Sequence, residues 1–475
     1  MGPDFTGHGF LIGTAHLLLA AAVTAHVLLH KRDVRAALGW IGLAWLSPVV
    51  GVILYFLFGI NRVTRRAIRF GGLRRERERE REAGDDARPD VPEPIALLAL
   101  VGRRVTGTDL AAGNRADLFE GGDEAYPAML AAIEAARHSI ALESYIFRGD
   151  EAGLKLADAL IAAHRRTVAV RVLIDGVGGG YLFSPIAHHL REAGVPVGRF
   201  LHSRVPWRMP FLNMRSHKKL LIVDGCVAFA GGLNIGAENC SRDGNPAPVD
   251  DVHARIEGPV VAQLMDVFGR DWFFAAGESL KDALWWPPLM PAGSVFARTI
   301  RSGPDADVYS LETILGAALT QARRRVRIVT PYFLPSQRLE SAIGQAVLRG
   351  VAVEIILPHQ GNHPLLDWAM RAQLRFFHEM PPVVFFSPAP FDHAKLATVD
   401  GEWCLIGSSN WDTRSLRLNF ELDIEFYDRA LTAQIDARID KRIALSHRVS
   451  RADLLRAPRW RKIRDAAIRL LSPYL

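Results

Sequence analysis

The chain has 475 residues, of which 49% are hydrophobic and 23% are charged. This composition excludes general disorder, and the length predicts two or three folded domains. Lys and Arg together outnumber Asp and Glu by 58 to 51, a formal net charge of +7 that favours anionic partners such as nucleic acid or a membrane surface. Three cysteines are too few for a disulfide framework, and we interpret Cys226, Cys240 and Cys404 as small buried residues in a reducing compartment.

Two apolar runs near the amino terminus, residues 10–30 and 36–58, contain no Asp, Glu, Lys or Arg. As a helix the first run would be about 31 Å long, close to the hydrocarbon thickness of a bilayer. The second run contains Pro48 and Gly51, where a kink is expected. We predict a membrane anchor over residues 1–72 with two transmembrane helices, and two buried core helices are the alternative. A cleaved signal peptide fits less well because the first nine residues contain no Lys or Arg.

Charges around the two runs predict their orientation. Lys31, Arg32 and Arg35 lie between the runs, whereas seven arginines follow the second run within residues 62–77. The positive-inside rule therefore places the carboxyl-terminal body in the cytoplasm. Residues 73–94, which include the alternating sequence RRERERERE, are predicted to form a solvated charged linker.

The rest of the chain contains an internal repeat. Residues 166–175 (RTVAVRVLID) and 349–358 (RGVAVEIILP) are rich in β-branched side chains, and each run follows a helical pattern, over 153–163 and 339–348. Alternating strands and helices predict α/β layers.

The repeat suggests the domain boundaries. We place a first domain at 95–290 and a second at 291–450, followed by a basic amphipathic tail over 451–475. Trp460 and Ile463 lie on one face of this tail. A helix on the membrane surface and a helix docked on the second domain both explain that pattern.

The strongest motif is a histidine, a lysine and an aspartate at fixed spacing, present once in each half and followed by glycine and asparagine. Matched residues differ by 176 positions, and two such copies are not a chance event. The pairs are His217 and His393, Lys219 and Lys395, Asp224 and Asp400, and Asn234 and Asn410.

The spacing has a physical meaning. Histidine and lysine two residues apart on a strand point to the same face. Two such faces brought together would form a pocket of two imidazoles, two ammonium groups and two asparagine amides, which suits a phosphodiester and requires no metal. Asp224 and Asp400 fall on the opposite strand face, where a buried ion pair is expected rather than direct catalysis.

At these residues the sequence resembles the phospholipase D superfamily, whose paired H-x-K-x4-D motifs meet in one active site. With its apolar amino terminus and the segments NMRSHKKLLIVDG and HAKLATVDGEWCLIGSSNWD, it is similar to bacterial cardiolipin synthases. The resemblance implies two similar phospholipase D-like α/β sandwich domains packed face to face behind a two-helix transmembrane hairpin. It also implies a multi-pass protein of the bacterial inner membrane that transfers a phosphatidyl group between two phosphatidylglycerol molecules, giving cardiolipin and glycerol.

The resemblance also implies roles for the motif residues. One histidine attacks phosphorus to form a phosphohistidine, and the other protonates the leaving alcohol and then deprotonates the incoming one. Family likeness makes His217 the nucleophile and His393 the acid and base, although the symmetry of the sequence allows the reverse. Imidazole can supply both protonation states near neutral pH. The motif lysines would neutralise the phosphoryl oxygens, and Asp224 and Asp400 complete the catalytic motif.

Each histidine also needs a carboxylate to fix its tautomer. Family likeness assigns this support to Glu421 and, in the first half, to Asp251. Asp250 precedes Asp251, where the family commonly has arginine.

The expected partners are phosphatidylglycerol and the membrane, without nucleic acid, metal or cofactor. Alternatives remain open: a phospholipase D-type hydrolase, another headgroup transferase or a nuclease would use the same centre. An inactive scaffold is the non-enzyme alternative, and the oligomeric state is not predicted.

Overall fold

The amino-terminal helices form a small hairpin of their own. The computed structural model describes residues 5–31, 34–47, 49–59, 91, 95–202, 214–241, 247–304, 307–375, 377 and 381–472. The predicted charged linker, residues 73–94, lies outside these ranges except for Val91. The hairpin consists of α1 (Phe5–His30), α2 (Val34–Leu46), α3 (Val50–Leu54) and the single π-helical turn η1 (Tyr55–Gly59).

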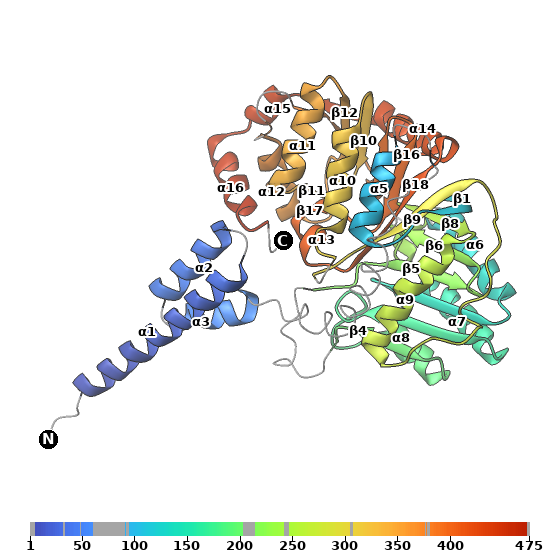
Figure 1. The fold of residues 1–475 in the computed structure, drawn as a ribbon, viewed down its shortest axis with the longest axis horizontal. Helices are drawn as coiled ribbons and strands as arrows, with labels where there is room; N and C mark the ends of the chain where they lie inside the picture. The colour runs from blue at the N-terminus through green and yellow to red at the C-terminus, as the bar shows by residue number, and fades with distance from the viewer. Residues whose placement is uncertain are drawn as a thin grey trace.

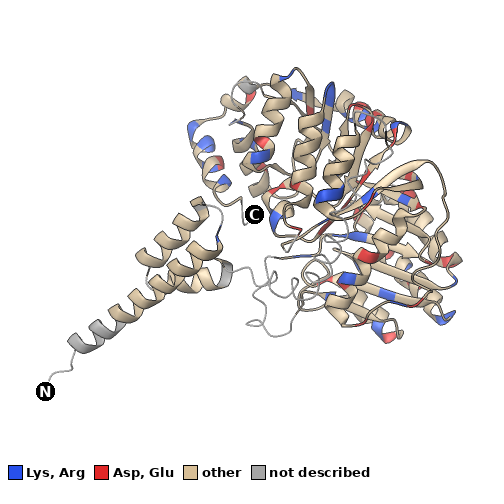
Figure 2. Ribbon diagram, in the orientation of Figure 1, with Lys and Arg blue, Asp and Glu red and all other residues tan. Residues whose placement is uncertain are grey.

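Side chains from α1, α2 and η1 pack together in this hairpin. Val27, Ala44 and Tyr55 are buried against one another, and the Tyr55 hydroxyl lies 2.7 Å from His26 Nδ1. Figure 2 shows these helices almost free of charged residues. The two apolar runs therefore pack against each other.

The second run differs from the prediction. Instead of one helix over 36–58, α2 ends at Leu46 and the short α3 begins at Val50. Within the described ranges α1 is the one helix long and apolar enough to cross a membrane, whereas α2 is apolar but shorter. The break falls beside the proline at which the sequence predicts a kink.

The body is built on one 15-stranded sheet whose strand order reads as two mirrored copies (Figure 1). The first half contributes β4 (Val197–Phe200), β3 (Ala169–Asp175), β2 (Ser139–Ser144), β5 (Lys219–Val223), β6 (Val227–Gly231), β8 (Val252–Glu257) and β1 (Ala111–Glu120), from the outer edge inward. In the second half the matching strands are β13 (Val383–Ser387), β12 (Ala352–Pro358), β10 (Arg325–Val329), β15 (Leu396–Val399), β16 (Trp403–Gly407), β18 (Glu421–Tyr427) and β9 (Val295–Ser302), with β19 (His447–Val449) added beyond β13. The predicted duplication of an α/β unit is confirmed.

The two halves meet in a way that the sequence did not predict. The antiparallel pairing of β1 with β9 joins them edge to edge, so they share one sheet instead of forming two separate sandwiches. Their inner faces also pack together, because one apolar cluster contains residues of both halves, such as Ala254 of β8 and Ile406 of β16. Face-to-face packing is therefore only part of the interface.

Helices cover both faces of the sheet. The inner layer contains α9 (Val260–Ala276) and α14 (Arg429–Leu445), one from each half. The outer layer of the first half is α6 (Gly122–Ala135), α7 (Glu151–Arg165) and α8 (Pro185–Glu192). On the second half it is α5 (Ala96–Thr106), α10 (Ser310–Gln321), α11 (Gln337–Leu348) and α12 (Pro364–Arg375).

Local sequence explains where the equivalent helices begin. The side chain of Asp150 accepts a hydrogen bond from the Gly153 amide at the start of α7, and Ser336 does the same for Leu339 at the start of α11. Such caps satisfy amide groups that a first helical turn leaves unpaired. Both helices then place an apolar face on the parallel strands that the repeat predicts.

One helix crosses between the halves. α5 precedes the first half in sequence, but Leu98 and Ala99 pack in the outer core of the second half, against α10. The fully buried Arg298 of β9 fixes this position by donating to the Ala99 carbonyl at 2.9 Å and by pairing with Glu425 of β18.

Two short helices, α15 (Arg451–Leu455) and α16 (Arg459–Arg469), end the described chain. α16 packs along α12 at the edge of the second half (Figure 1).

Candidate active site

Two backbone crossings bring the motifs of the two halves together. In the first, Ser216 forms an isolated bridge with Phe420, and the His217 amide donates to the Phe420 carbonyl at 2.8 Å. In the second, β14 (Phe391–Asp392) pairs with β7 (Val249–Asp250), and the His393 amide donates to the Asp250 carbonyl at 2.7 Å. Each histidine is therefore held directly beside the residue that precedes the carboxylate of the other half.

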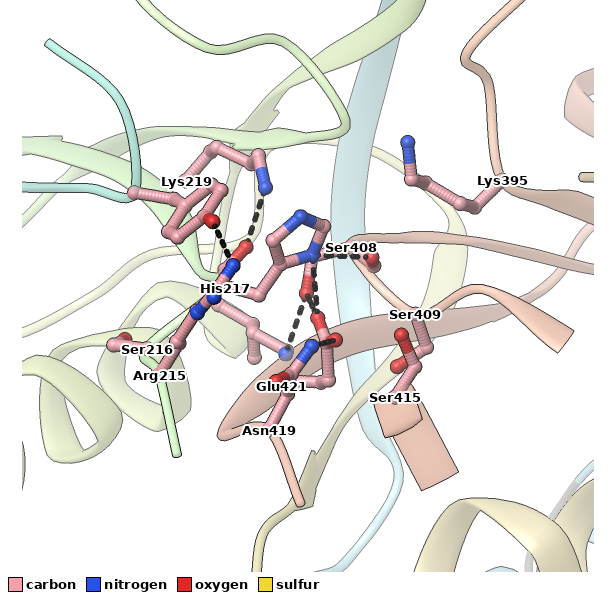
Figure 3. A network of polar contacts seen from close by, with 12 residues as sticks. Arg215, Ser216, His217, Lys219, Lys395, Ser408, Ser409, Ser415, Asn419 and Glu421 are labelled. Atoms are coloured by element: carbon pink, nitrogen blue, oxygen red, sulfur yellow. Dashed lines mark hydrogen bonds and ion pairs between the residues drawn. The ribbon is translucent and has the colours of Figure 1, made fainter. Parts of the chain in front are cut away.

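Because of this crossing, each histidine contacts the carboxylate of the opposite half. His217 Nδ1 lies 3.0 Å from Glu421 Oε2 and 3.0 Å from the Ser408 carbonyl oxygen (Figure 3). Both of these neighbours are acceptors, so Nδ1 carries a proton and Nε2 is left with its lone pair. Glu421 therefore contacts the histidine of the first half, whereas the sequence suggested a carboxylate downstream of each histidine in its own half.

The second histidine has a different environment. His393 Nδ1 lies 2.8 Å from Asp251 Oδ2 and 2.7 Å from Lys395 Nζ. It therefore faces one acceptor and one donor, whereas His217 faces two acceptors. This asymmetry is not visible in the repeated sequence.

The two imidazoles share one pocket with the two lysines. The ring centroids of His217 and His393 are 6.5 Å apart, and both lysine side chains are buried. Lys219 Nζ donates to the His217 carbonyl at 2.6 Å and lies 5.3 Å from the ring centroid of Tyr145. The structure thus brings together the four groups that the spacing predicts on one face.

Burial and the repulsion between like charges destabilise the protonated forms of the histidines and of Lys219 in this pocket. Burial, reinforced by the charge of Lys395, lowers the pKa of Lys219 to about 7. Burial and the same neighbour lower the pKa of His393 to about 4. The pKa of His217 is also lowered, mainly by burial, although Glu421 opposes the shift. A bound anion would reverse these shifts by compensating the positive charges.

The two supporting carboxylates remain ionised. Burial alone would raise the pKa of Asp251, but the charge of Lys395 and the hydrogen bond from His393 outweigh it and lower that pKa. Burial likewise opposes ionisation of Glu421, and the charge and hydrogen bond of His217 lower its pKa overall. Ser408 and Asn419 also donate to Glu421 (Figure 3).

The motif aspartates lie away from this pocket, in turns with positive φ after β5 and β15. The Asp224 carboxylate accepts hydrogen bonds from the amides of residues 137, 138 and 139, and Asp400 does the same for residues 323, 324 and 325. The expected buried ion pair is therefore wrong, because the partners of these carboxylates are backbone amides. Each aspartate fixes the loop that leads into the strand beside its motif.

The asparagines differ from each other. Asn234 Oδ1 accepts from the Ile146 amide at 3.4 Å, which occupies it in the loop after β6. Asn410 is nearly buried, and its Oδ1 has no hydrogen-bond partner within the described residues. Their expected phosphate-binding role remains a prediction.

A buried polar group behind His217 was not predicted from the sequence. Lys218, the middle residue of the first motif, forms an ion pair with Asp271 of α9, while Ser216 donates to Glu143 of β2. Burial and the nearby Asp271 raise the pKa of Glu143 to about 8. A charged residue on the core-facing side of a strand was the available signal, since such a side chain requires a partner.

Two further features bear on the expectations. All three cysteines are free; Cys240 and Cys404 are buried as predicted, but Cys226 is exposed. Among the described residues, no group of three or more His, Cys, Asp and Glu side chains is arranged to hold a metal ion.

Comparison with known proteins agrees with this geometry. A family model described as the cardiolipin synthase, PLD-like domain matches residues 129–272 and 315–443, more than half of the chain. The chain belongs to the cardiolipin synthase family. A second model, the phospholipase D-nuclease N-terminal domain, matches residues 18–59, which include the hairpin helices.

Relatives in this family match over the full chain. The major cardiolipin synthase of Bacillus subtilis is 30% identical, with 97% of each chain covered. Cardiolipin synthase A of Pseudomonas fluorescens is 32% identical, covering 99% of this chain and 100% of the relative. Among solved structures, phosphatidylserine synthase of Haemophilus influenzae matches with a TM-score of 0.62 at 16% identity, covering 80% of this chain and 100% of that one. This last likeness concerns the fold.

Proposed function

We propose that the chain is a cardiolipin synthase, which transfers a phosphatidyl group from one phosphatidylglycerol to the terminal hydroxyl of another, releasing glycerol. The observation that carries this proposal is the crossed pocket, in which two histidines 6.5 Å apart each contact a carboxylate of the opposite half. Two buried lysines supply the charge that a phosphodiester needs. One phosphodiester replaces another, so no nucleotide is required to drive the reaction.

In the first step His217 Nε2 attacks phosphorus, and the bond from phosphorus to the glycerol oxygen breaks. The leaving oxygen takes a proton from His393, so free glycerol departs and a phosphatidyl-His217 intermediate remains. The proton on Nδ1 of His217, held by Glu421 and the Ser408 carbonyl, leaves Nε2 as the nucleophilic nitrogen. This tautomer supports His217, rather than His393, as the nucleophile.

In the second step the hydroxyl of the acceptor gives its proton to His393 while its oxygen attacks phosphorus. The bond between phosphorus and His217 then breaks, which yields cardiolipin and restores both histidines. Lys219 and Lys395 stay beside the phosphoryl oxygens in both steps and stabilise the charge that accumulates there. Asp251 stabilises the protonated form of His393, which donates its proton in the first step and is restored in the second.

The acceptor carries its own phosphodiester, and we place that group beside Arg215 and Arg414. Arg215 donates to the Tyr145 hydroxyl at 2.9 Å, and the ring centroid of Tyr145 is 4.7 Å from that of His217. Burial lowers the pKa of Arg414, and the positive charge of Arg215 lowers it further. The two guanidinium groups are therefore close enough to repel each other. An anionic headgroup between them would relieve the repulsion and favour phosphatidylglycerol over water as acceptor.

A product assay tests the proposal. Purified full-length enzyme in detergent is given phosphatidylglycerol alone, without nucleotide, and lipids and free glycerol are quantified. We expect cardiolipin and glycerol in equal amounts, and loss of turnover by about three orders of magnitude or more in His217→Ala and His393→Ala. Phosphatidic acid as the main product would replace the synthase with a hydrolase. Substantial turnover in either variant would contradict the histidine mechanism.

We also propose that the hairpin anchors the enzyme in the inner membrane through two helices that each span the bilayer, with the catalytic body in the cytoplasm. The packing of α1 with α2 and η1 supports the hairpin, and the excess of arginine after the second apolar run supports the orientation. Protease protection of tagged termini in inverted membrane vesicles would test both points.

A further inference from the structure

The carboxyl-terminal helix α16 is turned with its apolar face away from the protein. Trp460 is 59% exposed, Ile463 is 70% exposed and Leu470, just beyond the helix, is 76% exposed. Trp460, Ile463, Ala467 and Leu470 follow one another at intervals of three or four positions, so they form one stripe along the helix. A helix that only covered its own domain would place this stripe inward.

The polar face of α16 is the one that docks on the body. Asp465 is buried and accepts a hydrogen bond from Arg375 of α12, and Arg464 lies 3.8 Å from the ring centroid of Trp368. Arg469 donates to Gln373 of α12 at 3.1 Å. Three polar contacts along one helix fix its rotation, so the outward direction of the apolar stripe is set by the docking.

Charge around the stripe has one sign. Arg459 and Arg461 are exposed beside the apolar residues, and Lys462 is half-buried. In the sequence from 454 to 472 the single acidic residue is Asp465, and it is occupied by Arg375 and Arg464. Figure 2 shows several blue segments, which mark Lys and Arg, along α16 at the edge of the body. An apolar stripe edged by cations is typical of helices that lie in the interface of an anionic membrane.

We propose that α16 is a second membrane contact, lying on an anionic phospholipid bilayer with Trp460, Ile463 and Leu470 in the headgroup region. This contact is separate from the hairpin anchor and does not depend on which alcohol accepts the phosphatidyl group. The charge complementarity with anionic lipid decides between a membrane and a second copy of the chain as the occupant.

Such a contact would set the orientation of the pocket over the lipid surface. α16 rests on α12, and α12 begins next to His363, whose ring centroid is 6.0 Å from that of Tyr332. Met370 and Leu374 of α12 belong to the apolar core of the second half, so α16 is docked on the half that carries His393 and Lys395.

The test uses the full-length protein reconstituted in vesicles. The exposed Cys226 is first replaced by Ser, and an environment-sensitive fluorophore is then attached to Ile463→Cys. In phosphatidylserine-rich vesicles we expect a blue-shifted emission that brominated lipids quench, and a marked loss of both signals in phosphatidylcholine vesicles or at high salt. The matched control is a label at Lys155→Cys on α7, whose side chain is 61% exposed, and it should stay unquenched throughout.

A charge variant separates this proposal from a simple apolar contact. In Arg461→Gln/Lys462→Gln we expect quenching at position 463 in anionic vesicles to fall severalfold, because each cation near the surface contributes to binding. The proposal would be overturned if the label at position 463 were quenched equally with and without the Arg461→Gln/Lys462→Gln change. It would also be overturned if that label remained in water in anionic vesicles. A blue shift without lipid quenching that grows with protein concentration would assign the stripe to a second copy instead.

Discussion

Lys219 is the residue whose protonation we expect to limit activity at high pH. Burial and Lys395 lower its pKa to about 7 in the free enzyme. As pH rises through that value the ammonium loses its proton and no longer stabilises the phosphoryl oxygens. We therefore predict that kcat/KM, which already declines as His393 loses its proton, falls more steeply above about pH 7, whereas kcat holds to higher pH because a bound phosphodiester raises both pKa values.

The variant Lys219→Arg separates this lysine from other groups. A guanidinium group stays protonated at all accessible pH values. The fall of kcat/KM that deprotonation of Lys219 causes above about pH 7 should therefore be lost in Lys219→Arg, even if the maximal rate of this variant is lower. Lys155→Arg on the surface of α7 serves as the control and should keep the wild-type profile. If Lys219→Arg retains the same limb in kcat/KM, the titrating group is a different one.

Glu421 is predicted to act on the histidine of the other half. Its charge opposes the effect of burial on His217, so Glu421→Gln should lower the pKa of that imidazole further. The pH dependence of acylation by diethyl pyrocarbonate, followed by mass spectrometry at His217, measures this shift. We expect turnover to fall about 10- to 100-fold, as for other residues that orient a catalytic ligand.

Asp251→Asn is the matched variant, because its carboxylate contacts His393. It should reduce turnover to a similar extent while leaving the titration of His217 unchanged. The crossed arrangement would be contradicted if the pKa of His217 shifted in Asp251→Asn but not in Glu421→Gln.

Among the elements, α5 is held on the second half by the close approach of Gly102 to Arg298. Substituting Gly102, with Gly316 as a control, tests this contact. A Cβ on Gly102 would lie 1.7 Å from Arg298 Nη2, and the buried ion pair with Glu425 prevents the guanidinium from moving away. Gly102→Ala should lower the free energy of unfolding by about 1–3 kcal/mol. Gly316→Ala in α10, where a Cβ meets nothing within 4 Å, should instead raise it by about 0.5–1 kcal/mol.

Thermal unfolding of both variants in detergent measures these opposite shifts. A similar change in melting temperature for the two glycines would mean that α5 is not fixed on the second half as the structure places it.

The elements also show what sequence alone can predict. Strands such as β3 and β12 follow from β-branched runs, and the motif spacing places histidine and lysine on one face. The pairing of β1 with β9 and the docking of α5 do not follow, because they join residues nearly 200 positions apart. Local periodicity carries no information on such pairing. The support of each histidine from the opposite half was missed for the same reason.

On the scale of the whole molecule, the crossed site makes each half dependent on the other. His217 takes its carboxylate from β18 of the second half, and His393 takes its carboxylate from Asp251, the residue between β7 and β8 in the first. The inner apolar cluster also contains residues of both halves, so a separated half would expose it to water.

We predict that fragments 1–290 and 291–475 are each inactive when produced alone. The cut falls beside Met290, a 77% exposed residue between α9 and β9, so it removes little packing. Co-expression of the fragments should restore cardiolipin formation, because β1 can pair with β9 without a peptide link. Introducing His217→Ala into the first fragment should abolish the restored activity. Turnover by either fragment alone would contradict a site that both halves must complete.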